Sequence, residues 1–584
     1  MALEKASGVY LTITDNSFQT GGTQSLNVVV PMLTTKGNIG LNYVTADTLD
    51  DVIGSYDPTF CPNYYGIKRI LEKVSYAQVW RLNQNSKIAN AYYSTAKGDK
   101  LTNSDARTIE DIKQLSSVLA VGHKFTGNWQ TTAVKFNPAF VSESVQNQHP
   151  IASSTQEITF TSISKTETTS INGTEVLGSC IFFDSTDSIV VGCIKEESSS
   201  FNVYPVVDGN IGDVSCGTAK FTGNDIKVTL QSEMSGDSFW NVHTISSELN
   251  KWTVTVASKD GSTYNVQNTY NFSFDPEDEN YIDNVDFGDI FIKADKFDPT
   301  WTDIRSYFTL ESGSNGDSSI VAGGIDLSVL DDCGCKILAM NGITDYKIVN
   351  RLVNSCEKNK IHIFADAPAY SAYIDVENWA KNIARSEYVA IGGRPDKTEI
   401  ATGKVVYIYP SVNYVLIYAS MLSNFGSLNY PPAGATTGII STEDLIKCDY
   451  ELYANELKTN RINWQRSNNI GTMMWEQRTT YSLNTDLSYI APTFIVDALA
   501  DELITFEQNF NFRYMTRSDL LNQESGIKSI LQNYIDNNYL FSYKLKMPSY
   551  EEAQKSGRTL NIGIEIVVMK DSEVININLI LNNA

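Results

Sequence analysis

The sequence predicts a multidomain fold of the α/β and α+β classes, and three stretches lead to this prediction. Residues 335–391 alternate apolar strands with helices, which is typical of a parallel sheet with helices on its faces. Residues 491–570 contain two amphipathic helices followed by strands, as α+β domains do. Residues 150–249 are rich in Ser, Thr and short alternating runs with Gly between them, which predicts a β-rich insert.

Composition supports a folded chain with several hydrophobic cores. The chain has 584 residues, of which 42% are hydrophobic and 19% charged, and this length corresponds to roughly three or four domains. Its formal net charge is -23, and it contains no run of Lys and Arg. Because such a surface repels phosphate groups, we expect no direct nucleic-acid binding.

The sequence also lacks membrane and secretion signals. No stretch approaches the ~20 apolar residues of a membrane helix, and the first residues lack the basic and apolar regions of a signal peptide. We therefore expect folding in a cytoplasm and no stable membrane insertion. The eight cysteines are scattered along the chain, which indicates reduced and mostly buried thiols.

Both ends of the chain have the pattern of strands without a local partner. Near the start, Val9, Leu11 and Ile13 alternate with Tyr10 and Thr12. The last thirteen residues, SEVININLILNNA, have the same character. Their apolar side chains are interleaved with asparagines and are Val574, Ile575, Ile577, Leu579 and Leu581. Nothing at this end discourages pairing, because it has no charged tail, Pro or bulge. A strand of this kind needs a partner.

The first part of the chain predicts an α/β arrangement. SLNVVVPML is typical of a buried strand, and YYGIKRILEKVSY places apolar residues at helical spacing. YAQVWRLN predicts a second strand. These elements form the N-terminal part of the predicted core.

The central stretch predicts three strands separated by two helices. The strands are CKILAM, KIHIFAD and EYVAIGG, and the helices are DYKIVNRLVNSC and DVENWAKNIA. Asn341, Gly342 and Asp366 follow strands on the side where such folds usually bind ligands. We favour a turn and capping role for them, because no convergent catalytic set accompanies them.

The C-terminal stretch predicts two helices and then strands. APTFIVDALADELITFEQN and GIKSILQNYIDNN each present a broad apolar face at helical spacing. NYLFSYKLKM and TLNIGIEIVVM follow with the alternation of strands. This order indicates an α+β closing domain.

The histidines limit any catalytic mechanism based on an imidazole. Within KIHIFAD, His362 and Phe364 share one face of the strand while Ile361 and Ile363 share the other, which favours a hydrogen-bonded core histidine. The other three stand in polar segments that we interpret as loops: His123, His149 and His243. None of them lies near a nucleophile-elbow motif, so the sequence predicts that the protein is not an enzyme.

Metal and nucleotide motifs are weak or missing. Cys333-Gly334-Cys335 is the one close thiol pair, and a metal site would have to recruit Cys356, Cys448 or His362. We favour two buried structural cysteines. The sequence contains no G-x-x-x-x-G-K-[ST] and no G-x-G-x-x-G, so we expect no cofactor.

A series of short motifs runs along the chain in a fixed order. SGVY opens it, and AQVWRLN, AVGHKFTGNW and the long strand pair from KWTVTV to NVD follow. Then come KILAMNGITD, IFADAP, YPPAG, WEQRT and FEQN. In this order the chain resembles the tail sheath proteins of contractile-tailed bacteriophages, over nearly all of its length except the insert. Tyr409-Pro410-Ser411 departs from the family's Pro-Pro-Ser, so we expect a rebuilt loop near 410–430.

The resemblance implies a domain organisation. It places an N-terminal arm at 1–22, the first part of the sheath core at 23–149 and a protruding β-rich domain at 150–249. A subtilisin-like α/β domain without a catalytic triad follows at 250–440, then an α+β core domain at 441–570 and a C-terminal strand arm at 571–584.

The resemblance also implies how the chain assembles. In this family both arms leave their own subunit and add strands to neighbouring subunits, which joins stacked hexameric rings into a helical tube around the inner tail tube. The residues of the two arms would be the alternating residues named above near the start and at the end of the chain. The acceptor sheet would include Ile562, Ile564, Ile566 and Val568.

A contracting sheath of this kind implies particular partners and a location. We expect further copies of the chain, the inner tail tube protein, and baseplate and tail terminator or neck proteins, in a virion tail assembled in the bacterial cytoplasm. Three alternatives stay open: the sheath of a phage-derived contractile injection system, a β-rich surface adhesin, and a hydrolase with a degenerate subtilisin fold.

Overall fold

The computed structural model describes residues 26–571, with gaps at 95–98, 139–147, 296–302, 400–402, 441, 443, 515 and 557–558. Within 148–250 it describes the strands and residues 212, 213 and 215. The chain divides into two compact units. The first unit comprises residues 1–84 and 318–584, and the second unit comprises residues 85–317.

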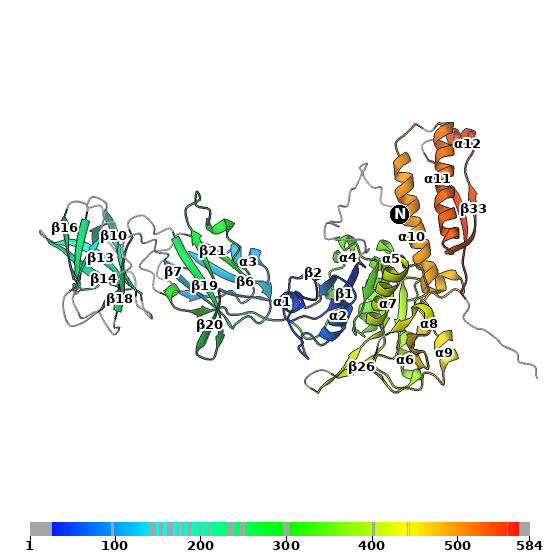
Figure 1. The fold of residues 1–584 in the computed structure, drawn as a ribbon, viewed down its shortest axis with the longest axis horizontal. Coiled ribbons are helices and arrows are strands. Elements are labelled where there is room, and N and C mark those ends of the chain that lie inside the picture. Colours follow the sequence, from blue (N-terminus) through cyan, green and yellow to red (C-terminus); the bar gives the residue numbers. More distant parts are fainter. Residues whose placement is uncertain are drawn as a thin grey trace, which may run out of the picture. The chain divides into compact units, whose positions relative to one another are not determined.

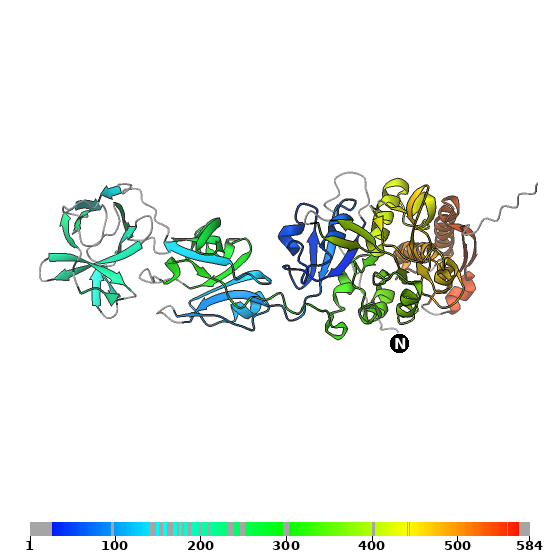
Figure 2. The ribbon, with the colours of Figure 1, turned by 90° about the horizontal axis from the view of Figure 1, so that it is seen from below.

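A seven-stranded sheet organises the first unit, in the order β2-β3-β1-β23-β24-β25-β30. Every neighbouring pair is parallel except β2 with β3. The strands that precede residue 85 therefore lie beside strands from beyond residue 336, as Figures 1 and 2 show in blue and green. The strands are β1 (Val28–Met32), β2 (Gly40–Val44), β3 (Ala77–Arg81), β23 (Ile337–Ala339), β24 (His362–Asp366), β25 (Val389–Gly392) and β30 (Ile462–Asn463).

Helices bury both faces of this sheet. Side chains alternate between the faces, so Ile337 and Ala339 join one apolar cluster and Leu338 joins the other. The first cluster includes residues of α2 (Tyr64–Ile70) and α7 (Pro410–Phe425), and the second includes residues of α5 (Tyr346–Asn359) and α6 (Tyr373–Ala380). The predicted alternation of strands and helices in 335–391 is confirmed.

Shorter elements surround the sheet. They are α1 (Leu49–Ile53), α4 (Val329–Asp332), α8 (Gly434–Thr437), α9 (Ala454–Thr459), β26 (Asp396–Glu399), β27 (Val405–Ile408), β28 (Ile439–Ile440), β29 (Asp444–Leu445), β31 (Gln465–Asn468) and β32 (Gly471–Met474). The rebuilt loop expected near 410–430 is wrong for its first part, because residues 410–425 form α7. Pro410 is at the first position of that helix, where its missing N–H costs no hydrogen bond.

Two long helices and a strand pair close the first unit. The helices are α10 (Ile490–Glu507) and α11 (Arg517–Asp536), and the strands are β33 (Leu540–Lys546) and β34 (Gly563–Val568), with the short helix α12 (Tyr550–Lys555) between the strands. The predicted order of helices and strands is confirmed. Helix α11 begins well before the predicted Gly526, because Thr516 and Asp519 form a capping box that satisfies the first N–H groups.

The second unit contains two four-stranded sheets, in the orders β21-β6-β4-β5 and β20-β19-β7-β22. One buried apolar cluster draws side chains from both sheets, including Val121, Phe136 and Trp252. The elements are β4 (Ile88–Tyr93), β5 (Lys100–Leu101), α3 (Ile109–Lys113), β6 (Leu119–Thr126), β7 (Thr132–Pro138), β19 (Lys251–Asp260), β20 (Thr263–Ser273), β21 (Ile290–Ala294) and β22 (Phe308–Thr309).

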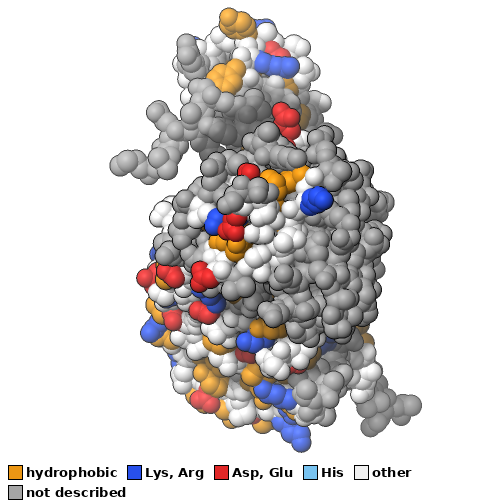
Figure 3. Space-filling view, turned by 90° about the vertical axis from the view of Figure 1, so that its left-hand side faces the viewer, with side chains coloured by type: hydrophobic (Ala, Val, Ile, Leu, Met, Phe, Trp, Pro, Cys, Tyr) orange, Lys and Arg blue, Asp and Glu red, His pale blue; other side chains and the backbone are white. Residues whose placement is uncertain are grey.

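The predicted β-rich insert contains a nine-stranded antiparallel sheet and a separate strand pair, β10 (Thr168–Ile171) with β11 (Thr174–Leu177). The sheet comprises β8 (Gln148–Pro150), β9 (Gln156–Phe160), β12 (Cys180–Asp184), β13 (Ile189–Glu197), β14 (Ser200–Val207), β15 (Asn210–Ile211), β16 (Gly217–Thr222), β17 (Asp225–Leu230) and β18 (Phe239–Ile245). Among the side chains that Figure 3 colours, acidic, basic and hydrophobic types are interspersed.

The two units divide the chain differently from the predicted domain ranges. Residues 251–294, placed by the resemblance in the α/β domain, contribute β19 and β21, which pair with β7 and β6 of the second unit. Strands β1 and β3, placed by the resemblance in the N-terminal part of the sheath core, belong to the parallel sheet of the first unit. Local patterns predict strands, whereas the choice of partner over such separations depends on the tertiary structure.

The insert begins and ends at adjacent backbone positions in the sheet that contains β7 and β19, which makes a clean excision possible. Strands β7 and β19 are antiparallel, and Pro138 lies opposite Trp252. We predict that replacing residues 139–251 by Asn-Gly, which favours a two-residue hairpin turn, leaves the remaining chain folded. Near-UV circular dichroism and a thermal melt check this.

The matched control carries the same excision together with Trp252→Ala. Trp252 is fully buried, so this change should cost about 3–5 kcal/mol of unfolding free energy and lower the melting temperature clearly. If the excision alone loses its cooperative melt, the insert is required for folding and the prediction is wrong.

Candidate interaction surface

Strands β33 and β34 form a two-stranded antiparallel sheet that carries the predicted acceptor residues. Ile564, Ile566 and Val568 alternate with exposed residues along β34, and Ile564 lies opposite Leu545 of β33. Ile562 directly precedes the strand and packs, partly buried, against the same apolar cluster. All four predicted acceptor side chains therefore belong to one face of this sheet.

Helices α10 and α11 support that face. The cluster beneath the strand pair consists of Ile495, Leu499, Ile527, Leu531, Tyr534, Leu540 and Val568. The helices are closely packed, because a Cβ added at Gly526 would lie 2.0 Å from Cζ of Phe506. A strand pair held on two packed helices keeps its edges in a fixed place.

Both strands have an open edge within the part of the chain that the structure describes. There, β33 pairs with β34 alone and β34 pairs with β33 alone. An unpaired strand edge presents N–H and C=O groups that another strand can use. The outer face adds apolar contacts, because Phe541 is 68% exposed and Val567 44%. The pair thus has the backbone and side-chain features of a strand acceptor.

The sequence prediction named residues of β34 and missed β33. The signal was present, since Phe541, Tyr543 and Leu545 alternate along NYLFSYKLKM. On the outer side Lys544 Nζ lies 3.2 Å from Glu565 Oε2, so these two exposed charges are matched across the strands, and Lys546 is a third exposed charge on β33.

The arm residues lie outside the described part of the chain. This applies to Val9, Tyr10, Leu11 and Ile13 at the start and to Val574, Ile575, Ile577, Leu579 and Leu581 at the end. Their pairing with a sheet remains a prediction.

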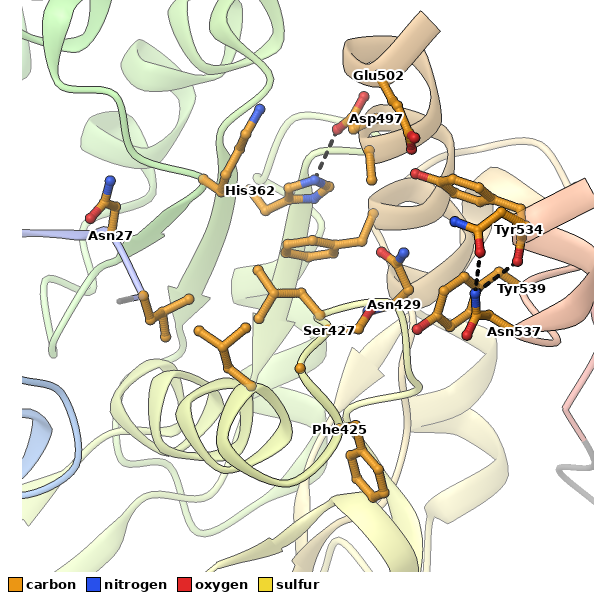
Figure 4. A pocket seen from close by; sticks show the side chains of 18 of the residues that line it. Asn27, His362, Phe425, Ser427, Asn429, Asp497, Glu502, Tyr534, Asn537 and Tyr539 are labelled. Atoms are coloured by element: carbon orange, nitrogen blue, oxygen red, sulfur yellow. Dashed lines mark hydrogen bonds and ion pairs between the residues drawn. The ribbon is translucent and has the colours of Figure 1, made fainter. Parts of the chain in front are cut away.

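A cavity of about 760 Å³ lies in the first unit, and its lining includes Tyr539, which directly precedes β33. Its walls come from the end of α7, from α10 and α11, and from residues at the start of β1, β23 and β24. Figure 4 shows His362 and Asp497 on one side and Asn429, Tyr534 and Tyr539 on another. The sequence offered no signal for this cavity, because distant segments supply its lining.

His362 is a hydrogen-bonded core residue, as predicted. Its Nε2 lies 3.0 Å from Oδ2 of Asp497, and its ring stacks on Phe494 with centroids 3.8 Å apart. Tyr388 donates its hydroxyl to the other oxygen of Asp497 at 2.8 Å. Burial lowers the pKa of His362 although Asp497 opposes the shift, so we expect the neutral form at neutral pH.

The predicted turn and capping residues meet in one buried network. Asp366 accepts hydrogen bonds from the Gly342 N–H at 2.9 Å, from the Ser411 N–H at 2.8 Å and from the Ser411 hydroxyl at 2.5 Å. The Ser411 hydroxyl in turn accepts from the Asn341 N–H at 2.9 Å. These bonds tie β23 and β24 to the start of α7. Ser411 is the partner that the sequence did not reveal, and its hydroxyl both donates and accepts a hydrogen bond within this network.

The three histidines interpreted as loop residues lie in strands, so that interpretation is wrong. His123 belongs to β6, is buried and stacks on Trp129 with centroids 4.1 Å apart. His149 belongs to β8 and His243 to β18. Alternating apolar neighbours, such as those in FWNVHTI, were the overlooked signal, because polar residues between them suggested loops.

The close thiol pair is buried, as predicted. Cys333 Sγ and Cys335 Sγ lie 3.1 Å apart, and Cys356 is also a buried free thiol. Over the described residues, no group of three or more His, Cys, Asp or Glu side chains could hold a metal ion. No helix in the described ranges is long and apolar enough to cross a membrane.

The described chain is a mixed α/β protein with several sheets, and sheath proteins are among the solved structures similar to it. No family model and no curated protein matches the chain. The sheath tail protein of Desulfitobacterium hafniense is 11% identical, with 93% of each chain covered and a TM-score of 0.43. The sheath tail protein of Listeria innocua is 10% identical, with 95% of this chain and 98% of that chain covered and a TM-score of 0.43. The contracted helical sheath of the anti-feeding prophage is 17% identical, with 44% and 74% covered and a TM-score of 0.37.

The Asp366 network predicts a pH dependence of stability. Burial raises the pKa of Asp366 to about 6, although its hydrogen bonds oppose the shift, whereas an unfolded Asp titrates near ~3.9. Between these values the folded state binds the extra proton, so unfolding free energy falls as pH rises from about 4 to about 6. We expect the unfolding free energy of wild type, relative to that of Asp366→Asn, to fall by up to about 3 kcal/mol over this range. Denaturant titrations of both proteins at each pH measure this difference.

Asp519→Asn serves as the matched control, because hydrogen bonds from Thr516 lower the pKa of Asp519. The stabilising contribution of Asp519 is lost as pH falls. The unfolding free energy of wild type relative to Asp519→Asn should therefore rise with pH, whereas that relative to Asp366→Asn falls. Equal pH profiles for wild type and Asp366→Asn would contradict the assignment of a raised pKa to this carboxyl group.

Proposed function

We propose that the chain is the structural subunit of a contractile tail sheath, which polymerises as stacked hexameric rings around an inner tail tube. The observation that carries the proposal is the open strand pair β33–β34 on its platform of α10 and α11. The alternating pattern at both chain ends supplies candidate donor strands in the same molecule. The ordered sheath-like motifs along the sequence support the same conclusion.

The energetics of strand exchange favour an array over a single contact. Burying five apolar side chains of the last segment contributes ~1.5–3 kcal/mol each. Ordering about ten residues costs ~1–2 kcal/mol apiece in backbone entropy. One docked arm is therefore marginal. Two arms per subunit, repeated around and between rings, make association multivalent and the polymer stable.

The proposed contraction uses packing energy. A signal from the baseplate releases an extended lattice, and the subunit cores slide and rotate into a more extensively packed lattice while the arms keep neighbours joined. This movement drives the tube through the host envelope for genome delivery. No nucleotide or other cofactor is needed for a transition between two packings of the same subunits.

The surroundings of the subunit follow from this role. The partners are further copies of the chain, the tail tube protein, and baseplate and tail terminator or neck proteins, in a virion tail assembled in the bacterial cytoplasm. The insert projects away from the tube, and its removal leaves assembly possible. A phage-derived contractile injection particle would use the same subunit chemistry.

An enzymatic role has less support. A subtilisin-type mechanism needs a histidine beside a nucleophilic serine. The Ser411 hydroxyl donates to buried Asp366, and His362 is bonded to Asp497. The parallel sheet of the first unit accordingly serves as a scaffold.

The C-terminal arm can be tested directly. We predict that purified wild-type chain forms tubes visible by negative-stain electron microscopy, and that deletion of residues 572–584 leaves folded, dispersed subunits. Ile577→Asp with Leu579→Asp should act like the deletion, because charges would enter the apolar side of the added strand. Asn576→Ser with Asn578→Ser, the matched control on the polar side, should still form tubes.

Sedimentation and a thermal melt accompany the micrographs, so that loss of assembly is separated from loss of folding. Tubes formed by the deletion variant would reject the role of the C-terminal arm. Dispersed wild-type subunits that stay dispersed after addition of the tail tube protein would reject the sheath function itself.

A further inference from the structure

The turn Cys333-Gly334-Cys335 has no role in the proposed sheath function. It lies between α4 and β23, and its two thiols are free, buried and in hydrogen-bond contact at 3.1 Å. We propose that Cys333 and Cys335 form a redox-active dithiol that a hydroperoxide converts into an intramolecular disulfide. This site goes beyond the sheath function and does not depend on it.

The backbone already holds the two sulfur atoms in place. Gly334 has φ of 60°, a left-handed conformation that favours glycine. The Cys333 carbonyl accepts a hydrogen bond from Gln78 Nε2 at 2.9 Å, and the Gly334 carbonyl accepts a weaker one from Asn27 Nδ2 at 3.5 Å. A disulfide has an S–S length of ~2.05 Å, so the sulfur atoms must approach by only about 1 Å.

The hydrogen bond between the thiols makes them unequal. It lowers the pKa of Cys333 to about 7 and raises the pKa of Cys335. Cys333 is therefore the better source of thiolate, which is the nucleophilic form. Burial instead raises the pKa of Cys61 to about 12 and raises that of Cys356, which makes these two thiols internal references.

A small oxidant has a path to the pair. Gly334 is exposed, and a Cβ added there would meet no atom within 4 Å. Gly334 also lines the cavity of about 760 Å³ shown in Figure 4. The two thiols are themselves only 4% and 3% exposed, so a hydroperoxide that enters at Gly334 lies one residue from each and needs a small opening of the turn to reach Cys333.

The reaction balances without any further reagent. The Cys333 thiolate attacks the terminal oxygen of the hydroperoxide, the O–O bond breaks, and the leaving alkoxide, or hydroxide from hydrogen peroxide, takes up the proton that Cys333 released and departs as an alcohol or water. The resulting sulfenic acid is attacked by Cys335, the S–O bond breaks, and water leaves with the proton of Cys335. Two thiols lose two electrons in total, and these reduce the peroxide.

The test uses the full chain and hydrogen peroxide in small molar excess at pH 7.5. After quenching, the protein is denatured, labelled with N-ethylmaleimide and digested with trypsin, which releases residues 306–336 with both cysteines in one peptide. We expect this peptide to lose both labels and 2 Da at least about tenfold faster than Cys61 and Cys356 lose theirs. The rate should rise with pH through about 7, following the Cys333 thiolate.

Two single variants separate the roles of the thiols. Cys335→Ser should stop at a sulfenic acid on Cys333 that a 1,3-dione reagent traps, and Cys333→Ser should make Cys335 as slow as Cys356. Melting curves verify that each variant is folded. Label loss from residues 306–336 at the rate of Cys61, or a disulfide to another chain, would overturn the proposal.

Discussion

The parallel pairing of β1 with β23 is the constraint on which the arrangement of the chain depends. Val28 lies opposite Ile337 in this pair, so two segments more than 300 residues apart become neighbours. Between them the chain first adds β2 and β3 to the same sheet, and then residues 85–317 form the second unit before the chain returns to the sheet at β23. The second unit is thus an excursion from the sheet, and the β-rich insert between β7 and β19 is a further excursion within it. Each closure of a long loop costs only slightly more entropy than that of a shorter one, which allows large insertions at such points.

The candidate interaction surface is a sheet of only two strands, β33 and β34, and each strand leaves one edge without a backbone partner within the described chain. Two strands alone are marginal, and here α10 and α11 provide the apolar support that two strands lack. Support on one face fixes the strands, while their outer edges keep unpaired backbone groups within the described chain. Such an edge offers N–H and C=O groups to which a further strand could bind.

Buried polar groups mark where the first unit is tied together. Asp366 and Ser411 join β24 to α7, and His362 with Asp497 joins β24 to α10. Each group would be costly to bury unpaired, so each pair specifies one arrangement of its helix on the sheet. The pair of His362 and Asp497 also lines the cavity of about 760 Å³.

The sequence by itself determined the local elements, because periods of two and of 3.6 residues are local properties. It predicted β24, α5 and α10, the core role of His362, the β-rich insert and the strand character of β34. The tertiary structure alone decided which strands became neighbours, that residues 251–294 belong to the second unit, and that Ser411 meets Asp366. It also placed the edge of β33 beside that of β34. Such pairings arise from packing between distant segments, and no pattern within either segment encodes them.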